Sequence, residues 1–282
     1  MFRFLAWVLL LSFPLAQSPQ STGTKIVIRR VSGRHSSEQV IYRTADKRRT
    51  EFRNFVQQKG SDGSVEWVLE PEMAIIERCD LGESFVLKLK TAEYTSAPYP
   101  LKPSSPEELA ARGTTKPEAT EPDRPTLQIE TTTVDTGERR EMFGHTARRT
   151  ITTTKQTPLE GSQQQFQETI TDGWYIDLNQ ELSCDQTSSV KRGYVMSAAL
   201  LGSGKVPREK PEFVDIGPRE TGLAVKEVRI SRGSHGLPDG TRAHSRVLIE
   251  SEVTLFEEGL QDPNLFEVPN GFQHVALLPG NQ

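Results

Sequence analysis

The 282-residue chain has few of the residues on which catalysis and metal binding most often depend. It has two cysteines and five histidines, and no HExxH, His-x-His or Cys/His spacing of a metal site occurs. The glycine motifs of nucleotide and phosphate binding and the GxSxG motif of hydrolases are also missing. We therefore expect no enzyme and no cofactor, and the sequence nominates no catalytic, cofactor-binding or metal-binding residue.

The sequence also lacks an excess of basic residues and a long hydrophobic run. Lys and Arg number 34 against 38 Asp and Glu, which gives a net charge of -4. A duplex-binding protein normally carries a basic surplus, so we expect no nucleic-acid partner. Hydrophobic residues make up 34% of the chain, a share that excludes a polytopic membrane protein but is sufficient for a folded core.

The N-terminus is typical of a secretory signal peptide, assigned to residues 1–17 with cleavage after Ala16. Arg3 supplies the positive charge, residues 4–13 are almost wholly apolar, and small and polar residues follow. The apolar run is shorter than the roughly 20 residues that a spanning helix needs. The alternative is an uncleaved N-terminal anchor. We expect an exported protein, periplasmic or extracellular, with no stable membrane span after cleavage.

Cys79 and Cys184 are the two cysteines of the chain. In an oxidising compartment they can pair, and the loop between them is long enough for a bond to stabilise the fold substantially. Two free, buried thiols are the alternative. A disulfide would tie the two halves of the chain together.

A proline-rich segment, residues 97–125, divides the chain. Seven of the 18 prolines lie in it, which favours extended backbone and predicts a linker or an exposed insertion. A short helix fits residues 105–113, which have a capping serine, an early proline and a final glycine. The remaining chain forms a first β half, residues 24–96, and a second β half, residues 126–282.

Both halves show short β-branched segments separated by turn residues, which is typical of a mainly β fold with antiparallel strands. Turns are predicted at residues 61–64, 80–83, 135–138 and 172–173, and a capped turn at residues 262–266. Strands are predicted at residues 25–31, 39–44, 49–56, 65–69, 74–79, 84–89, 127–134, 146–154, 164–171, 173–178, 222–231, 243–257 and 273–278. Residues 190–201 are ambiguous and fit a helix over one sheet face.

Three large aromatic residues lie in predicted strands: Trp67, Trp174 and Tyr175. Such residues usually belong to a core, but on an open curved sheet they would line an apolar ligand pocket. Arginine pairs at residues 29–30, 48–49, 139–140 and 148–149 offer charge for an anionic ligand. Adjacent strand residues point to opposite faces, so ion pairing with acidic side chains on neighbouring strands is the simpler interpretation.

Several segments resemble uncharacterised exported bacterial β proteins, which are themselves similar to the lipoprotein-carrier (LolA/LppX-like) superfamily. The segments that carry this resemblance are the signal peptide, the strands of residues 49–89, the run DTGERREMFGHTAR at 135–148 and the run DPNLFEVPNGF at 262–272. The resemblance implies a curved antiparallel sheet or incomplete barrel, with one or two short helices or loops over a concave face. In the carriers that face holds acyl chains. The proline-rich insertion and the cysteine pair depart from the carrier pattern.

Three functions follow as hypotheses. The first is a non-enzymatic envelope protein that binds a lipid or acyl chain in a half-open β-barrel, which predicts a hollow lined by strand residues. The second is a structural or interaction module with a filled core and no ligand in it, whose partner is another envelope protein. The third is a hydrolase, which predicts a polar cleft with Ser or Asp near a histidine.

Overall fold

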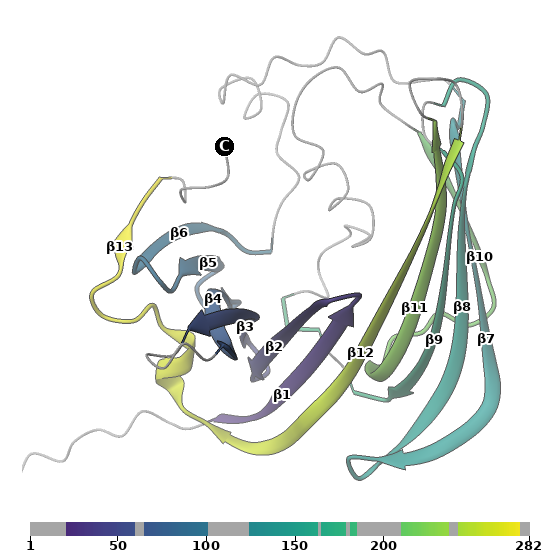
Figure 1. Ribbon diagram of the computed structural model, residues 1–282. Helices are drawn as coiled ribbons and strands as arrows, with labels where there is room; N and C mark the ends of the chain where they lie inside the picture. Colours follow the sequence, from purple (N-terminus) through teal and green to yellow (C-terminus); the bar gives the residue numbers. More distant parts are fainter. Residues whose placement is uncertain are drawn as a thin grey trace, which may run out of the picture.

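The computed structural model describes residues 21–59, 65–100, 124–162, 165–178, 181–184, 210–236 and 242–276. These residues form one open sheet of 13 strands, so the prediction of a mainly β fold is confirmed (Figure 1). Along the sheet the order is β10-β7-β8-β9-β11-β12-β1-β2-β3-β4-β5-β6-β13. The strands are β1 (Ser21–Ser32), β2 (His35–Arg43), β3 (Lys47–Lys59), β4 (Val65–Arg78), β5 (Glu83–Lys88), β6 (Glu93–Pro98), β7 (Leu127–Met142), β8 (His145–Pro158), β9 (Gln167–Ile176), β10 (Pro211–Ile216), β11 (Leu223–Gly236), β12 (Arg242–Gln261) and β13 (Gln273–His274).

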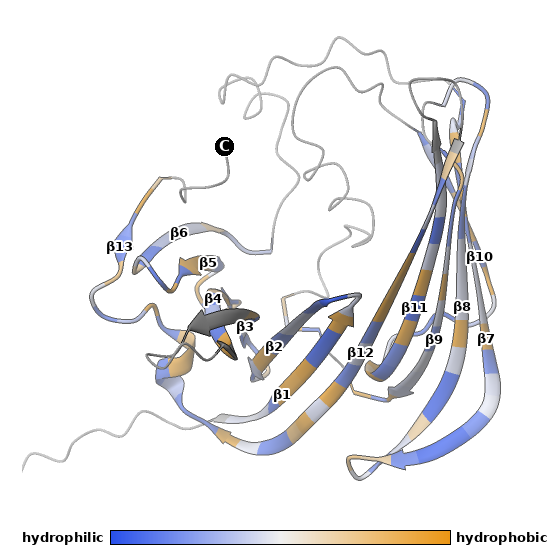
Figure 2. Ribbon diagram, viewed as in Figure 1, coloured by the Kyte–Doolittle hydropathy of each residue, from blue (hydrophilic) through white to orange (hydrophobic). Residues whose placement is uncertain are grey.

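All strand pairs are antiparallel except β10 with β7 and β13 with β6, which are parallel and lie at the two ends of the sheet. Figure 2 shows why the sequence pattern predicts strands, because apolar and polar bands alternate along β1 and β12. Side chains of successive strand residues point to opposite faces. The alternation therefore makes one face of each strand more apolar than the other.

The two halves of the chain meet where β12 pairs with β1. The pairing runs from Ser21 opposite Gln261 to Val31 opposite Glu250, which joins the start of the described chain to a strand near its end. The first and second β halves therefore belong to one hydrogen-bonded sheet. No pairing among the described residues connects β10 to β13, so this sheet has two ends.

The sheet divides at its middle. The pairing between β11 and β12 begins at Lys226 and Glu252. The part of β12 after Glu252 pairs only with β1, and the part of β11 before Lys226 pairs only with β9. The two branches separate and then pack on each other. Phe143, at the tip of the β7–β8 hairpin, lies 6.1 Å from Phe256 of β12, measured between ring centroids.

The space between these branches is filled by a core that we call the fork core. Its residues are at most 4% exposed: Ile26, Ala147, Ile176, Leu223, Val225 and Val253. Bulges place an extra residue in β11 and in β12 at this point. Such bulges bend a strand and let neighbours diverge.

A second core lies on β4 and β5 and is covered by the C-terminal segment. It consists of Ala74, Ile76, Leu87 and Phe266, and we call it the capped core. Phe266 ends the 3-10 turn η2 (Pro263–Phe266), whose N-cap Asp262 accepts a hydrogen bond from the Asn264 amide at 3.0 Å. The capped turn predicted at residues 262–266 is confirmed.

Two arginines hold η2 on the sheet. Arg49 donates to the Leu265 carbonyl at 3.2 Å and Arg78 to the Phe266 carbonyl at 3.1 Å. The guanidinium groups therefore satisfy backbone carbonyls where the turn meets the strands, and Arg78 is itself only 6% exposed.

Two predicted turns are wrong. Residues 135–138 lie inside β7, where Asp135 accepts the Gly137 amide at 2.9 Å and supports a bulge, and the chain reverses after Met142 instead. Residues 172–173 lie inside β9. Gly173 leaves room there for the Tyr175 ring, which lies 2.6 Å from the position that a Cβ would take.

β4 is longer than expected, because it unites the two strands predicted at residues 65–69 and 74–79. Within the described ranges the one helical element is η2, so the predicted short α-helices are not among them. The segments proposed as helices, residues 105–113 and 190–201, lie outside the described residues, as do the signal peptide and most of the proline-rich segment. No helix in the described part is long and apolar enough to cross a membrane.

Candidate functional site

The predicted cysteine pair is confirmed. Cys79 directly follows β4 and is bonded to Cys184, with 5.6 Å between the Cα atoms. The Ser183 amide donates to the Ala45 carbonyl at 3.0 Å, and Leu182 is fully buried. The disulfide thus fastens the segment after β9 to the end of β4, and the hydrogen bond fastens it to the turn between β2 and β3, so the two halves are linked by a structural bond.

The aromatic candidates occupy different environments. Trp174 packs against the fork core, and the Arg140 guanidinium lies 5.1 Å from the centroid of its ring. Tyr175, on the other face of β9, is 9% exposed and donates a hydrogen bond to Glu227 at 3.4 Å. Burial raises the pKa of the Tyr175 hydroxyl. Trp67 lies in β4 opposite Gln57, and its side chain is outside the described part of the structure.

The structure thus places Trp174 and Tyr175 on opposite faces of β9, packed among protein groups, and brings neither into the cavities described below. The disulfide joins residues 79 and 184, and neither cysteine lines either cavity. Among the described candidates, Trp174, Tyr175 and the disulfide therefore do not converge on one site.

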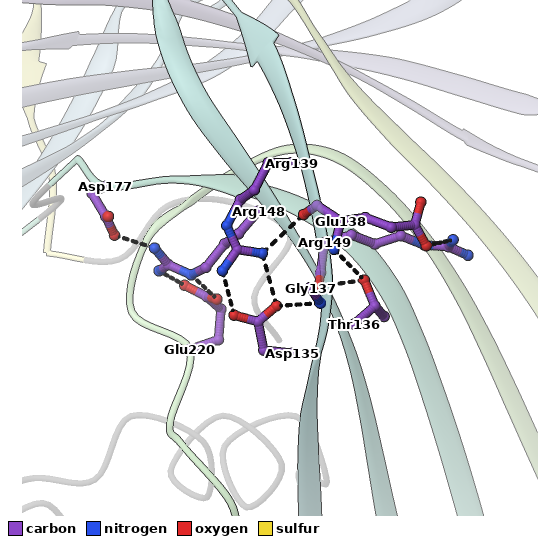
Figure 3. Close-up of polar contacts among 9 residues, drawn as sticks. All are labelled: Asp135, Thr136, Gly137, Glu138, Arg139, Arg148, Arg149, Asp177 and Glu220. Atoms are coloured by element: carbon purple, nitrogen blue, oxygen red, sulfur yellow. Dashed lines mark hydrogen bonds and ion pairs between the residues drawn. The ribbon is translucent and has the colours of Figure 1, made fainter.

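An arginine cluster surrounds the bulge of β7 (Figure 3). Arg148 contacts Glu220 with two hydrogen bonds, of 2.6 and 2.9 Å, and also pairs with Asp177. Its neighbour Arg149 turns to the other face of β8 and pairs with Asp172 at 2.6 Å and Glu138 at 2.6 Å. The ion-pair interpretation of this arginine pair is confirmed.

These contacts also set the carboxylate pKa values. The hydrogen bond from Arg139 and the Gly137 amide lowers the pKa of Asp135 to about 2. Arg149 likewise lowers the pKa of Asp172. Because each arginine already contacts a carboxylate, the cluster locks the β7 bulge against β8 and the segment before β11 and offers little unpaired charge to a ligand.

Hydroxyl side chains cover one face of the second half. In the strand register Thr131 faces Thr154 and Thr133 faces Thr152, with hydroxyl oxygens 3.4 and 3.2 Å apart. We call this the hydroxyl face; it comprises Thr131, Thr133, Thr152, Thr154, Thr169, Thr171 and Ser231, of which Thr133 is buried. The pairs cross from β7 to β8, from β8 to β9 and from β9 to β11, so four strands share one kind of surface.

The hydroxyl face ends in a cavity, which we call the polar pocket. Its volume is about 350 Å³. It is lined by Gln156, Gln165, Phe166, Gln167, Ser231, Arg232, Gly233, Ser234, Ser245 and Val247. The Phe166 side chain is 44% exposed, and the Ser234 amide donates to the Phe166 carbonyl at 3.4 Å. Strands β8, β9, β11 and β12 all contribute.

A smaller cavity, of about 70 Å³, lies over β1, β2 and β3 between Ile28, Phe52 and Arg53. A water molecule occupies about 30 Å³ in the liquid, so this space suits water rather than a chain-like ligand. The polar pocket is accordingly the better candidate for binding.

The sequence interpretation missed the polar pocket. Its residues are scattered over four strands, and one local signal was available: Phe166 is an isolated aromatic residue within a glutamine run at residues 163–167. Single exposed apolar residues are common on protein surfaces, so this signal alone does not identify a site.

No known protein-family model matches the chain, and no curated protein is similar enough to count as a relative. Across the described residues, no three His, Cys, Asp or Glu side chains gather in a way that could hold a metal ion.

Proposed function

We propose that the chain is a non-enzymatic, exported envelope protein that acts as an interaction module, with a filled core and a polar binding surface. The single observation that carries this proposal is the contrast between its interior and its cavities. The fork core and the capped core bury their apolar residues to at most 4% exposure, whereas six of the ten residues that line the larger cavity are glutamine or serine. Binding would therefore use the surface rather than a hollow interior.

Export is supported by the Cys79–Cys184 bond, because disulfides form and persist mainly in oxidising compartments. The described ionisable groups with shifted pKa values support a non-enzymatic role. Apart from Tyr175, they lie in arginine–carboxylate and lysine–carboxylate pairs, where each charge has a partner. A catalytic acid or base is usually found in a cleft instead.

A second proposal, carriage of a lipid or acyl chain by a curved sheet resembling the lipoprotein carriers, has its own support. The face opposite the hydroxyl face carries an apolar row in which Ile170 faces Ile230, and Ile230 faces Leu248. Leu248 is 43% exposed. An acyl chain lying along this row would gain about 0.8 kcal/mol for each CH₂ group that it buries.

Native mass spectrometry of the exported protein, purified without detergent, separates the two proposals. The interaction module predicts the mass of the chain alone and no stoichiometric lipid in an organic extract. A bound lipid in the wild type that is lost in Leu248→Asp would establish carriage and contradict the module. Leu260→Asp is the matched control, because Leu260 is also exposed on β12 but lies outside the row.

A further inference from the structure

We propose that the polar pocket binds neutral carbohydrate, as one or two sugar residues of a glycan chain. This inference rests on the proposed interaction module and names the class of ligand that the module takes. The volume of about 350 Å³ falls at the lower end of the range for small-ligand sites, about 300–1,000 Å³.

The polar lining of the pocket matches the chemistry of sugar hydroxyls. Gln156, Gln165 and Gln167 contribute three amides, each with one acceptor oxygen and one NH₂ donor, and Gln156 faces Gln167 directly across β8 and β9. Ser231 and Ser245, which lie on the same face as these amides, add hydroxyls that can both donate and accept, and the Ser245 hydroxyl donates to the Gly233 carbonyl at 3.5 Å. Adjacent hydroxyls of a sugar ring also donate and accept, so such a lining can satisfy several of them at once.

Phe166 supplies the apolar part of the recognition. Its side chain is 44% exposed although it lies in the wall of a cavity, so much of it is open to a ligand. The C–H groups on one face of a pyranose ring form a small apolar patch, which packs well on an aromatic ring.

The charges around the pocket disfavour other ligand classes. Arg232 is the one charged residue in the lining, and its guanidinium is 3.8 Å from the carboxylate of Glu168. A phosphate or nucleic-acid site would need several cations. An acyl chain would need an apolar lining, whereas Phe166 and Val247 are the two large apolar residues in this wall.

The hydroxyl face extends the same chemistry away from the pocket. Thr154 lies two residues before Gln156 on β8, and Thr169 lies two residues after Gln167 on β9, so both share a face with the pocket amides. The Thr169 and Ser231 hydroxyls are 3.1 Å apart. A glycan longer than the pocket would therefore find further hydroxyl partners along the strands.

The test is isothermal titration of the mature, disulfide-bonded chain with hexasaccharides of N-acetylglucosamine, β-linked glucose, α-linked glucose and mannose at millimolar concentration. We expect saturable binding of at least one. Phe166→Ala should weaken that binding about fivefold or more through loss of the ring contact, and Gln167→Ala should weaken it as well. Phe213→Ala is the matched control, because Phe213 is 43% exposed on β10, outside the pocket, and binding should not change.

Two results would overturn the inference: no saturable binding of any of the four saccharides by the wild type, or equal binding by wild type and Phe166→Ala. Neither result bears on the filled core. If the protein carries no lipid and also binds none of the saccharides, the proposal of an interaction module stands and the proposal of a carbohydrate ligand is wrong. A stoichiometric lipid lost in Leu248→Asp would remove the module itself.

Discussion

The two halves of the sheet are built differently. In the first half one sheet face is covered, because η2 lays Leu265 and Phe266 over β3 and β4 and closes the capped core. In the second half, long strands carry hydroxyl pairs on one face and an apolar row on the other. The comparison teaches that the core of the first half is closed by a covering segment, whereas that of the second half, the fork core, is closed where two branches of the sheet pack together.

The arginine contacts differ in the same way between the two halves. In the first half Arg78 reaches the C-terminal segment through the Phe266 carbonyl and the Glu267 carboxylate. In the second half Arg148 and Arg149 hold the β7 bulge and the segment before β11. The first-half arginine therefore holds the covering C-terminal segment in place, whereas the second-half arginines hold the bulge in β7.

The largest expected effect comes from removing the cover of the first half. Phe266→Ala leaves a cavity under η2 where a side chain is 1% exposed, and should lower the free energy of unfolding by about 3–5 kcal/mol. Urea denaturation measures it. Phe213→Ala in the second half, at an exposed site, should change stability little. Equal losses in the two variants would mean that burial of the Phe266 ring under η2 does not stabilise the fold.

Removal of the bond between the halves should have the next largest effect. Replacing both Cys79 and Cys184 by alanine should lower the free energy of unfolding by about 2–4 kcal/mol, because the unfolded chain gains freedom. Thermal unfolding of the variant should match that of the wild type under reducing conditions. An unchanged unfolding midpoint would show that the sheet pairing alone holds the halves together.

Acid should weaken both halves. Hydrogen bonds from Arg78 and Arg149 lower the pKa values of Asp80 and Asp172 in the folded state. Each carboxylate therefore stabilises the fold above its unfolded pKa of about 3.9, and this contribution is lost as the pH falls through the lower folded value. Unfolding measured from pH 7 downward should show a loss of stability beginning near pH 5.

Asparagine substitutions sharpen that comparison. Asp172→Asn should lower stability at neutral pH and flatten the acid dependence that originates in the second half, and Asp80→Asn should do the same for the first. Asp135, with a pKa of about 2, should protonate last. A variant with a pH profile as steep as that of the wild type would show that its carboxylate does not contribute.

The smallest expected effect concerns the hydroxyl face. The double variant Thr133→Val with Thr152→Val replaces one hydroxyl pair by side chains of similar shape that also favour strands. Removing both partners leaves no unpaired group, so the free energy of unfolding should change by less than about 1 kcal/mol. A loss as large as that of Phe266→Ala would mean that this face is a core rather than a binding surface.

Much of the fold could be predicted, because strands are recognisable from local sequence patterns. The alternation of Val247, Ile249 and Val253 with charged residues predicted β12, and the cap at Asp262 predicted η2. The errors at Asp172 and Gly173 show the limit of this approach. Aspartate before glycine is typical of a turn, but here the glycine makes room for the ring of Tyr175, a contact that only packing reveals.

The candidate site was less predictable than the fold. The polar pocket needs Gln156, Gln167 and Ser245, which lie on three strands and meet through the sheet register. A one-residue shift of register would turn each of these side chains to the other face. Trp174 and Tyr175, which the sequence singled out, are instead packed among protein groups.

Taken by itself, the sequence determined the strand character of the chain, the one possible intramolecular cysteine pair and the opposed directions of Arg148 and Arg149. These follow from residue type and from the two-residue period of a strand. Tertiary structure alone decided that β12 pairs with β1, that the sheet divides at the fork core and that amides and hydroxyls converge on the polar pocket. Those features join residues far apart in the chain, whose contacts depend on register and packing rather than on local sequence.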